Sequence, residues 1–254
     1  VTHRREGTTS LYRLMLDDLE PSARKLWLLV REQIGSTSAA EQDDRRVQRV
    51  LAERQTKSQR FFSSEAGRWD RYRSELFGSR FDLAALPAAL DREAVVGDLG
   101  CGTGQMSETL APFVGKIVAV DSSTEMLKAA RKRLKELANV DIRRGDLTAL
   151  PLDDGELDLA MVFLVLHHLP DPAAVLGEVA RTLKPGGKVV VVDMLPHDHK
   201  EYQQTMGHIW LGFAGGQMRD WLTQAKLREI HVTALPVDPN AKGPALFAAS
   251  ARAK

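Results

Sequence analysis

The stretch from Val95 to Gln105 constrains this chain most. It reads Val-Val-Gly-Asp-Leu-Gly-Cys-Gly-Thr-Gly-Gln, which is a short apolar strand, three alternate glycines and the start of a helix. Glycine allows positive φ angles and a close approach of the backbone to a ligand, and a helix N-terminus presents unpaired amides. The pattern predicts a strand–turn–helix unit beside a nucleotide-like ligand. Because such turns also occur for steric reasons alone, the residues that follow decide between the two interpretations.

Strands and helices alternate after residue 94. Strands are predicted at 94–98, 117–121, 140–143, 157–163 and 187–193, and helices at 104–113, 124–137 and 172–183. Two further helices at 201–213 and 217–226 and two closing strands at 228–234 and 245–250 are less clear. This alternation predicts an α/β fold, a Rossmann-like, doubly wound and mostly parallel seven-stranded sheet with an antiparallel edge.

Capping residues mark the ends of the predicted helices. Ser122, with Glu125 three residues later, predicts one helix start, and Asp171 before Pro172 predicts another. The run from Lys184 to Gly187 predicts the end of the second of these helices.

The first 90 residues differ in character from the rest. In order, they predict a β-hairpin with Gly7 at its turn over 1–14, an amphipathic helix over 17–34, a polar helix over 39–59, an aromatic and Arg-rich helix over 61–77 and a short helix within 81–90. The aromatic helix is interpreted either as packing on the next domain or as a lid on a substrate pocket. We therefore divide the chain into three parts: the hairpin and amphipathic helix over 1–35, a connector with lid helices over 36–90, and a ligand-binding domain over 91–254.

Three aspartates follow or end successive predicted strands. Asp121 lies 17 residues after Gly104 and suits the two hydroxyls of a ribose, and Asp146 falls at the equivalent tip of the next strand. Asp98 precedes the glycine turn, where a carboxylate repels a pyrophosphate but attracts an ammonium or sulfonium. S-adenosylmethionine carries both cations and no phosphate, so the acids favour it over a nicotinamide dinucleotide.

These residues resemble the class I S-adenosylmethionine-dependent methyltransferases, in order through most of residues 60–193. The matching elements are Gly97–Gly104, Val120–Ser122, Gly145–Leu147, Asp158–Leu169 and Leu183–Gly187. The resemblance implies that Asp98 binds the methionine amino group, that Asp121 binds the ribose, and that His167 lies beside the sulfonium. It implies the full set of cofactor residues Asp98, Gly100, Cys101, Gly102, Gly104, Asp121, Ser122, Met126, Asp146, Leu147, Phe163 and His167.

Methyl transfer rests largely on positioning, and a base is needed only where the acceptor must lose a proton. The candidate bases are His167, His168, His197, His208 and Tyr72, of which we select His167, His208 and Tyr72 as catalytic residues. For each histidine, a purely structural hydrogen bond is the alternative. The expected activity is methyl transfer to an unidentified small molecule, with S-adenosylhomocysteine as the other product.

No metal site is predicted. Asp193, His197, Asp198 and His199 lie close together in the sequence, but polar loops at strand ends commonly collect such residues. Cys101 is the single cysteine, which excludes an internal disulfide and a cysteine-rich site for arsenite, so we interpret it as a small filler of the glycine turn.

The N-terminal hairpin and the helix after it resemble the wing and final helix of an arsenic-repressor-type (ArsR) winged-helix domain, and Met206–Phe213 resembles a segment of methyltransferases fused to such domains. The resemblance implies a recognition helix upstream of this sequence and DNA as a partner. The polar helix over 39–59 is either a solvated connector or gains an apolar partner by dimerisation, and we expect a homodimer formed through residues 17–59. The alternative function is a transcriptional regulator that senses S-adenosylmethionine or S-adenosylhomocysteine without turnover. With no apolar run of about 20 residues and no signal peptide, we expect a cytoplasmic protein that does not enter a membrane.

Overall fold

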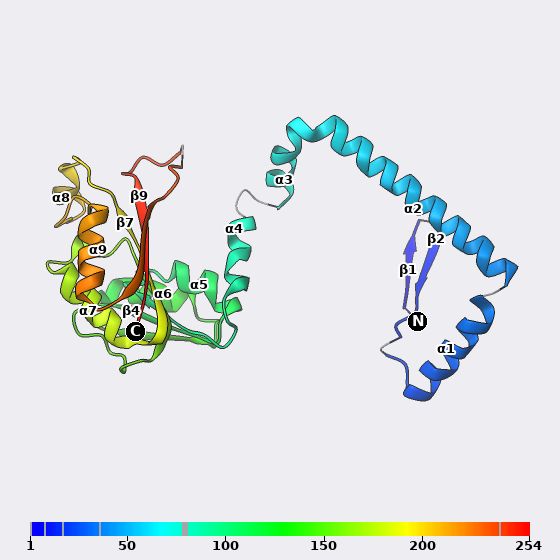
Figure 1. Cartoon of the computed structure of the whole chain (residues 1–254), viewed down its shortest axis with the longest axis horizontal. Helices are drawn as coiled ribbons and strands as arrows, with labels where there is room; N and C mark the ends of the chain where they lie inside the picture. The colour runs from blue at the N-terminus through cyan, green and yellow to red at the C-terminus, as the bar shows by residue number, and fades with distance from the viewer. Residues whose placement is uncertain (1, 8, 17, 36, 78–80, 239) are drawn as a thin grey trace. The chain divides into compact units, whose positions relative to one another are not determined.

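The computed structural model describes residues 2–7, 9–16, 18–35, 37–77, 81–238 and 240–254. The chain forms two compact units, Val1–Ser79 and Arg80–Lys254, which appear in Figure 1 in blue to cyan and in green to red. Among the described residues, no helix combines the length and the apolar character needed to cross a lipid bilayer.

The N-terminal unit is a hairpin followed by helices. Strands β1 (Thr2–Glu6) and β2 (Thr9–Arg13) pair antiparallel, and Gly7 between them has a φ of +60°. The helices are α1 (Pro21–Gly35), α2 (Ser38–Glu65), the 3₁₀ turn η1 (Ala66–Arg68) and α3 (Trp69–Phe77). The hairpin and the first two helices are confirmed, whereas the predicted helix over 61–77 is divided at η1.

The C-terminal unit is built on one seven-stranded sheet with the order β5-β4-β3-β6-β7-β9-β8. The strands are β3 (Val95–Leu99), β4 (Lys116–Asp121), β5 (Val140–Arg144), β6 (Leu157–Phe163), β7 (Leu183–Met194), β8 (Arg228–Ala234) and β9 (Leu246–Arg252). The first five strands in this order are parallel, and β9 runs antiparallel to both β7 and β8. The predicted doubly wound, mostly parallel sheet is confirmed.

Helices cover both faces of this sheet (Figure 1). The helices of this unit are α4 (Phe81–Ala85), η2 (Leu86–Ala89), α5 (Gln105–Leu110), η3 (Ala111–Phe113), α6 (Thr124–Arg133), η4 (Leu166–His168), α7 (Pro172–Thr182), α8 (Glu201–Thr205) and α9 (Gly215–Gln224). Alternate residues of β4 belong to two separate apolar clusters: Ile117 packs with residues of α5 and α6, and Val118 with residues of α7 and α9. Burial on both faces explains why the sequences of the central strands are continuously apolar.

Some predicted boundaries are wrong. The N-cap of α6 is Ser123, whose hydroxyl accepts from the Met126 amide at 3.3 Å, and not Ser122. Asp171 caps α7 as predicted, but Lys184–Gly187 lies within β7, because α7 already ends at Thr182. The helix predicted over 201–213 ends at Thr205, and Gly207 and Gly212 follow it with φ angles of +70° and +83°.

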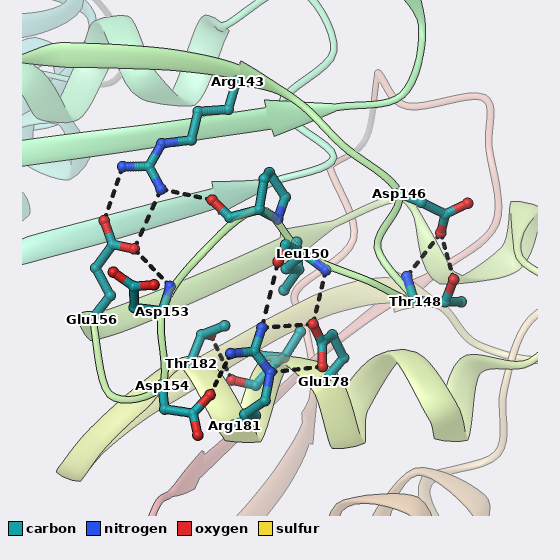
Figure 2. A network of polar contacts seen from close by, with 12 residues as sticks. Arg143, Asp146, Thr148, Leu150, Asp153, Asp154, Glu156, Glu178, Arg181 and Thr182 are labelled. Carbon is teal, nitrogen blue, oxygen red and sulfur yellow. Dashed lines mark hydrogen bonds and ion pairs between the residues drawn. The ribbon is translucent and has the colours of Figure 1, made fainter.

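A polar network ties α7 to the loop between β5 and β6 (Figure 2). The Arg181 guanidinium donates to both carboxylate oxygens of Glu178, at 2.9 and 2.7 Å, and to Asp154 at 2.6 Å. The second partner of Glu178 is the Leu150 amide, which donates to it at 2.8 Å. The bond from Arg181 holds the pKa of the Glu178 carboxyl below its usual range, so the pair is charged at neutral pH. The network fixes the loop that follows Asp146.

We predict that Arg181→Ala lowers the free energy of unfolding by about 1–3 kcal/mol at pH 7, because it removes charged hydrogen bonds from a side chain that is 32% exposed. Arg181→Lys keeps the charge but not the two-pronged geometry and recovers only part of the loss. Urea unfolding followed by tryptophan fluorescence measures both variants.

The same pair predicts a dependence on pH. Because the Glu178 pKa is lowered in the folded state, its stabilisation is complete above the unfolded value of about 4.3 and is lost as pH falls through the lowered pKa. The difference in free energy of unfolding between wild type and Arg181→Ala should therefore become smaller at acidic pH. Equal stability of the two proteins at pH 7 would contradict the assignment.

Candidate functional site

The glycine turn connects β3 to α5 as predicted. Gly100, Gly102 and Gly104 all have positive φ angles, of +80°, +52° and +79°. The amides of Gly100 and Cys101 both donate to the Val120 carbonyl, at 2.8 and 2.9 Å, which holds the turn against the end of β4. A Cβ at Gly100 would lie 2.5 Å from a methyl group of Val165, so this position also requires glycine for space.

Asp121 ends β4 and faces the same turn. One carboxylate oxygen, Oδ2, accepts from the Gly102 amide at 2.8 Å, and Oδ1 accepts from the Ser123 amide at 2.8 Å. The two backbone bonds fix the plane of the carboxylate. Each oxygen keeps a further lone pair, so the group can accept two hydroxyls from one ligand.

Asp98 lies in β3 directly beneath the turn and is only 5% exposed. Both the amide and the hydroxyl of Ser107 donate to its Oδ2, at 3.1 and 2.6 Å. Burial raises the pKa of this carboxyl, Ser107 opposes the shift, and the charge of Asp121 adds to it. In the part of the chain that the structure describes, no lysine or arginine forms an ion pair with Asp98. A buried carboxylate without a counter-ion suits a cationic ligand group.

Asp146 follows β5 and is exposed. Its Oδ1 accepts from the Thr148 amide at 2.8 Å and from the Thr148 hydroxyl at 2.7 Å, and these bonds lower the pKa of the carboxyl. Figure 2 shows the second oxygen of Asp146 turned away from Thr148. That oxygen is available to a ligand at the carboxyl end of β5.

A cavity of about 410 Å³ opens at these strand ends. Seven of the predicted cofactor residues line it, and five other residues complete the lining: Gly100, Gly102, Asp121, Ser122, Met126, Asp146 and Leu147 with Ser123, Leu164, Val165, His168 and Leu169. The lining contains two acids and no lysine or arginine. A slightly larger hollow of about 470 Å³ lies at the opposite end of β7, beside Arg181 and Lys254, and has no acidic lining residue. Ligands of open α/β sheets bind at the carboxyl ends of strands, which favours the first cavity.

The other predicted cofactor residues are not among those that line the cavity: Asp98, Cys101, Gly104, Phe163 and His167. Cys101 is 8% exposed and packs in the apolar cluster of α5 and α6, where burial raises the pKa of its thiol to about 12. Phe163 packs against the same cluster, and Gly104 is the N-cap of α5. The position of Cys101 agrees with its interpretation as a filler.

A cluster of three histidines lies next to the cavity. The rings of His167, His168 and His208 have centroids 4.2, 4.3 and 5.0 Å apart. His167 and His208 are buried, whereas His168 is exposed and lines the cavity. Burial, followed by the neighbouring His167, lowers the pKa of both His168 and His208, so both imidazoles are neutral at neutral pH.

Asp193 positions the first of these rings. His167 Nδ1 lies 2.8 Å from Asp193 Oδ1, and Asp193, near the end of β7, is fully buried. The sequence reasoning missed this pair. A signal for it existed in the parallel pairing of the predicted strands, because neighbouring parallel strands end at the same edge and here Phe163 pairs with Val192.

The segment over 207–213 holds His208 against His167. The amides of Ile209 and Trp210 donate to the His167 carbonyl at 2.9 and 3.1 Å, and the Trp210 indole donates to the Leu169 carbonyl at 2.9 Å. The structure thus brings together two of the three predicted catalytic residues. Tyr72, the third, lies in α3 of the N-terminal unit, and its role stays a prediction.

Comparisons with known proteins agree with this geometry. Residues 97–191 match the family model described as "Methyltransferase domain". The chain is 44% identical over 112 residues to an uncharacterized 37.1 kDa protein in transposon TN4556 of Streptomyces fradiae, covering 43% of this chain and 32% of that protein. It is 40% identical over 102 residues to the demethylmenaquinone methyltransferase of Lactococcus lactis, covering 38% and 40%.

A third curated relative and a solved structure are also similar to this chain. The ubiquinone biosynthesis O-methyltransferase of Xanthomonas oryzae is 35% identical over 119 residues, which is 46% of each chain. The chain spans less than half the length of these curated relatives. An S-adenosylmethionine-dependent methyltransferase from Mesorhizobium loti shares the fold with a TM-score of 0.57, 22% identity and coverage of 68% of this chain and 97% of that one. Residues 97–191, with the glycine turn, Asp121 and Asp146, therefore match a methyltransferase domain, and the C-terminal unit shares the fold of a solved methyltransferase.

Proposed function

We propose that this protein transfers a methyl group from S-adenosylmethionine to a small-molecule acceptor. The observation that carries the proposal is the buried carboxylate of Asp98, which has no cationic partner among the described residues and lies beneath a glycine turn flanked by Asp121 and Asp146. A ligand with a cationic methionine part and an uncharged adenosine part complements these groups. A pyrophosphate cofactor would instead meet two carboxylates and no basic side chain in the cavity lining.

The three acids, Leu147 and the glycine turn then each have a task. Asp98 would bind the ammonium, Asp121 the ribose hydroxyls, and Asp146 with Leu147 the adenine, while the glycine turn allows the ligand to approach the backbone. When bound, S-adenosylmethionine supplies a methyl group on a sulfonium, which leaves as a neutral thioether. The protein therefore has to align the acceptor, exclude water and, for a hydroxyl acceptor, remove a proton.

His167 is our proposed base. Asp193 accepts from its Nδ1–H, which leaves the Nε2 lone pair to take a proton from an acceptor hydroxyl. The relatives named for demethylmenaquinone and for ubiquinone biosynthesis suggest a hydroxylated quinone-type ring as acceptor. The ring of Tyr202, 5.3 Å from that of His208, adds an aromatic surface for such a ring.

The N-terminal unit suggests a second copy of the chain as partner. Helix α1 buries none of its residues, and Leu26, Leu29 and Ile34 are 64%, 61% and 54% exposed. We propose that residues 17–59 form a homodimer contact next to a winged-helix remnant. The regulator alternative requires affinity for DNA that changes with the cofactor, and no comparison supports it, so methyl transfer remains our proposal.

The cofactor proposal predicts a loss of affinity when the acids are replaced. Isothermal calorimetry should show that Asp121→Ala and Asp98→Asn each bind S-adenosylmethionine about 10- to 100-fold more weakly than wild type. Asp220→Asn, an exposed change on α9, serves as the matched control and should bind normally. Unchanged affinity in both site variants, or no binding by wild type, would refute the cofactor assignment.

The raised pKa of Asp98 predicts that the stability of the ligand-free protein falls as pH rises, which is the reverse of the effect of Glu178. Because the folded-state pKa is raised, the unfolded chain loses this proton first, and the free energy of unfolding falls as pH rises from about 3.9 to the raised pKa. Above the raised pKa the carboxyl is ionised in both states, so the full cost of burying its charge lowers the free energy of unfolding. The ligand-free Asp98→Asn protein should therefore melt at a higher temperature than wild type at pH 7, and a lower melting temperature would count against an uncompensated charge.

The base proposal predicts that His167→Asn lowers kcat about 10²- to 10⁴-fold on a reduced quinone or catechol acceptor, with cofactor affinity retained. His231→Asn, an exposed histidine in β8, is the control and should act as wild type. A His167→Asn enzyme that keeps the full rate would remove His167 from the mechanism.

The dimer proposal is tested by light scattering. Wild type should have the mass of two chains, and deletion of residues 17–59 should give one. A dimer that persists after the deletion would place the contact elsewhere.

A further inference from the structure

We propose that His167, His168 and His208 form a binding site for one divalent transition-metal ion of the zinc type. One ring nitrogen from each histidine lies within 4.8 Å of the other two, although the residues come from two separate segments of the chain. The sequence predicted no metal here, because His208 is far from the other two and the more obvious cluster was Asp193, His197, Asp198 and His199.

The ring nitrogens of two of the histidines are already oriented. His167 Nδ1 faces the Asp193 carboxylate at 2.8 Å, and His168 Nδ1 faces the Gly207 carbonyl at 3.4 Å. Both acceptors favour the tautomer that carries its proton on Nδ1 and leaves Nε2 as the metal ligand. A carboxylate behind a histidine is the usual outer support of a metal-binding imidazole.

His208 supplies an independent sign of a missing ligand. Its Nδ1 is buried and has no hydrogen-bond partner in the part of the chain that the structure describes, and the residue is only 8% exposed. Asp193 Oδ2 is likewise buried without a partner there. Unpaired buried polar atoms cost about 1–3 kcal/mol each. The cavity lining contains no lysine or arginine that would repel a divalent cation beside the rings, and the Asp193 carboxylate would attract the ion.

The spacing requires only a small adjustment. Zinc–nitrogen bonds of about 2.0–2.1 Å in a tetrahedron separate ligand nitrogens by about 3.4 Å. The ring nitrogens lie within 4.8 Å of one another, so each pair has to approach by at most about 1.4 Å to share an ion. His168 is exposed and can rotate about its side-chain bonds, whereas His167 and His208 are buried.

The donor set indicates the class of ion. Three neutral imidazoles suit Zn²⁺, Co²⁺, Ni²⁺ and Cu²⁺, whereas Mg²⁺ and Ca²⁺ prefer oxygen ligands. Three protein ligands also leave a fourth position open toward the cavity that His168 lines. If methyl transfer proceeds as proposed, an ion on His167 Nε2 excludes proton transfer to the same atom, so the loaded and the proton-accepting forms are alternatives. This consequence alone rests on the proposed function.

Metal binding is tested on the whole chain by titration with Co²⁺, followed by visible absorption, and by competition with Zn²⁺. We expect one equivalent of Co²⁺ with the intense bands of a tetrahedral site, displaced by Zn²⁺ and not by Mg²⁺. His168→Ala, at an exposed position, and His208→Asn should each weaken binding at least about tenfold. His231→Ala is the matched control and should bind normally.

A second measurement needs no substitution at a buried position. Imidazole NMR signals of the wild-type protein should shift on addition of Zn²⁺ for His167, His168 and His208 and not for His231. Absence of a stoichiometric ion, or binding that survives His168→Ala and His208→Asn but is lost in His197→Ala or His199→Ala, would overturn the proposal. Because calorimetry with S-adenosylmethionine is independent of the ion, failure here is distinguishable from failure of the proposed function.

Discussion

The register between parallel strands is the constraint on which the site depends. Leu99 pairs with Val120, so the glycine turn and Asp121 begin at the same level of the sheet, and Asp121 pairs with Arg144, which brings Asp146 to the next position along the edge. On the other side, Phe163 pairs with Val192, so the histidines after β6 meet Asp193 at the end of β7. A slip of one residue would turn alternate side chains to the opposite face and separate these groups.

The site keeps a charge that the fold alone would not favour. Asp98 is buried, its carboxyl has a raised pKa, and Ser107 is its only hydrogen-bond donor among the residues that the structure describes. The unmet charge is a cost to the ligand-free protein and a source of affinity for a cation. The same reasoning applies to the unpaired atoms of Asp193 and His208 on the other side of the cavity. Buried polar groups without partners indicate where a ligand could bind, and His197 Nε2 is a third such atom in the described part of the chain.

Much of the sheet could be predicted from the sequence, and so could the placement of the three acids along one edge. Asp98, Asp121 and Asp146 stand at or just after the ends of consecutive strands, and strand ends of a parallel sheet share one edge. The histidine pair with Asp193 was missed, because it depends on which strand lies beside β6. The cap at Ser123 was missed because two adjacent serines are equivalent until the backbone angles are known.

The error at residues 201–213 has a separate cause. Met206, Ile209, Trp210 and Phe213 recur at helical spacing, yet in the structure Phe213 is buried in the sheet core and Trp210 bonds to the Leu169 carbonyl. Gly212, whose φ is +83°, packs against the Leu195 carbonyl where no side chain fits. In the proposed function, the acceptor would lie between the β7–α9 connection, which carries His208, and His167 after β6, whereas the cofactor would lie at the ends of β3, β4 and β5. Variation in the β7–α9 connection would then change the acceptor while the sheet and the three acids stay constant, so the two halves of the proposed site can evolve at different rates.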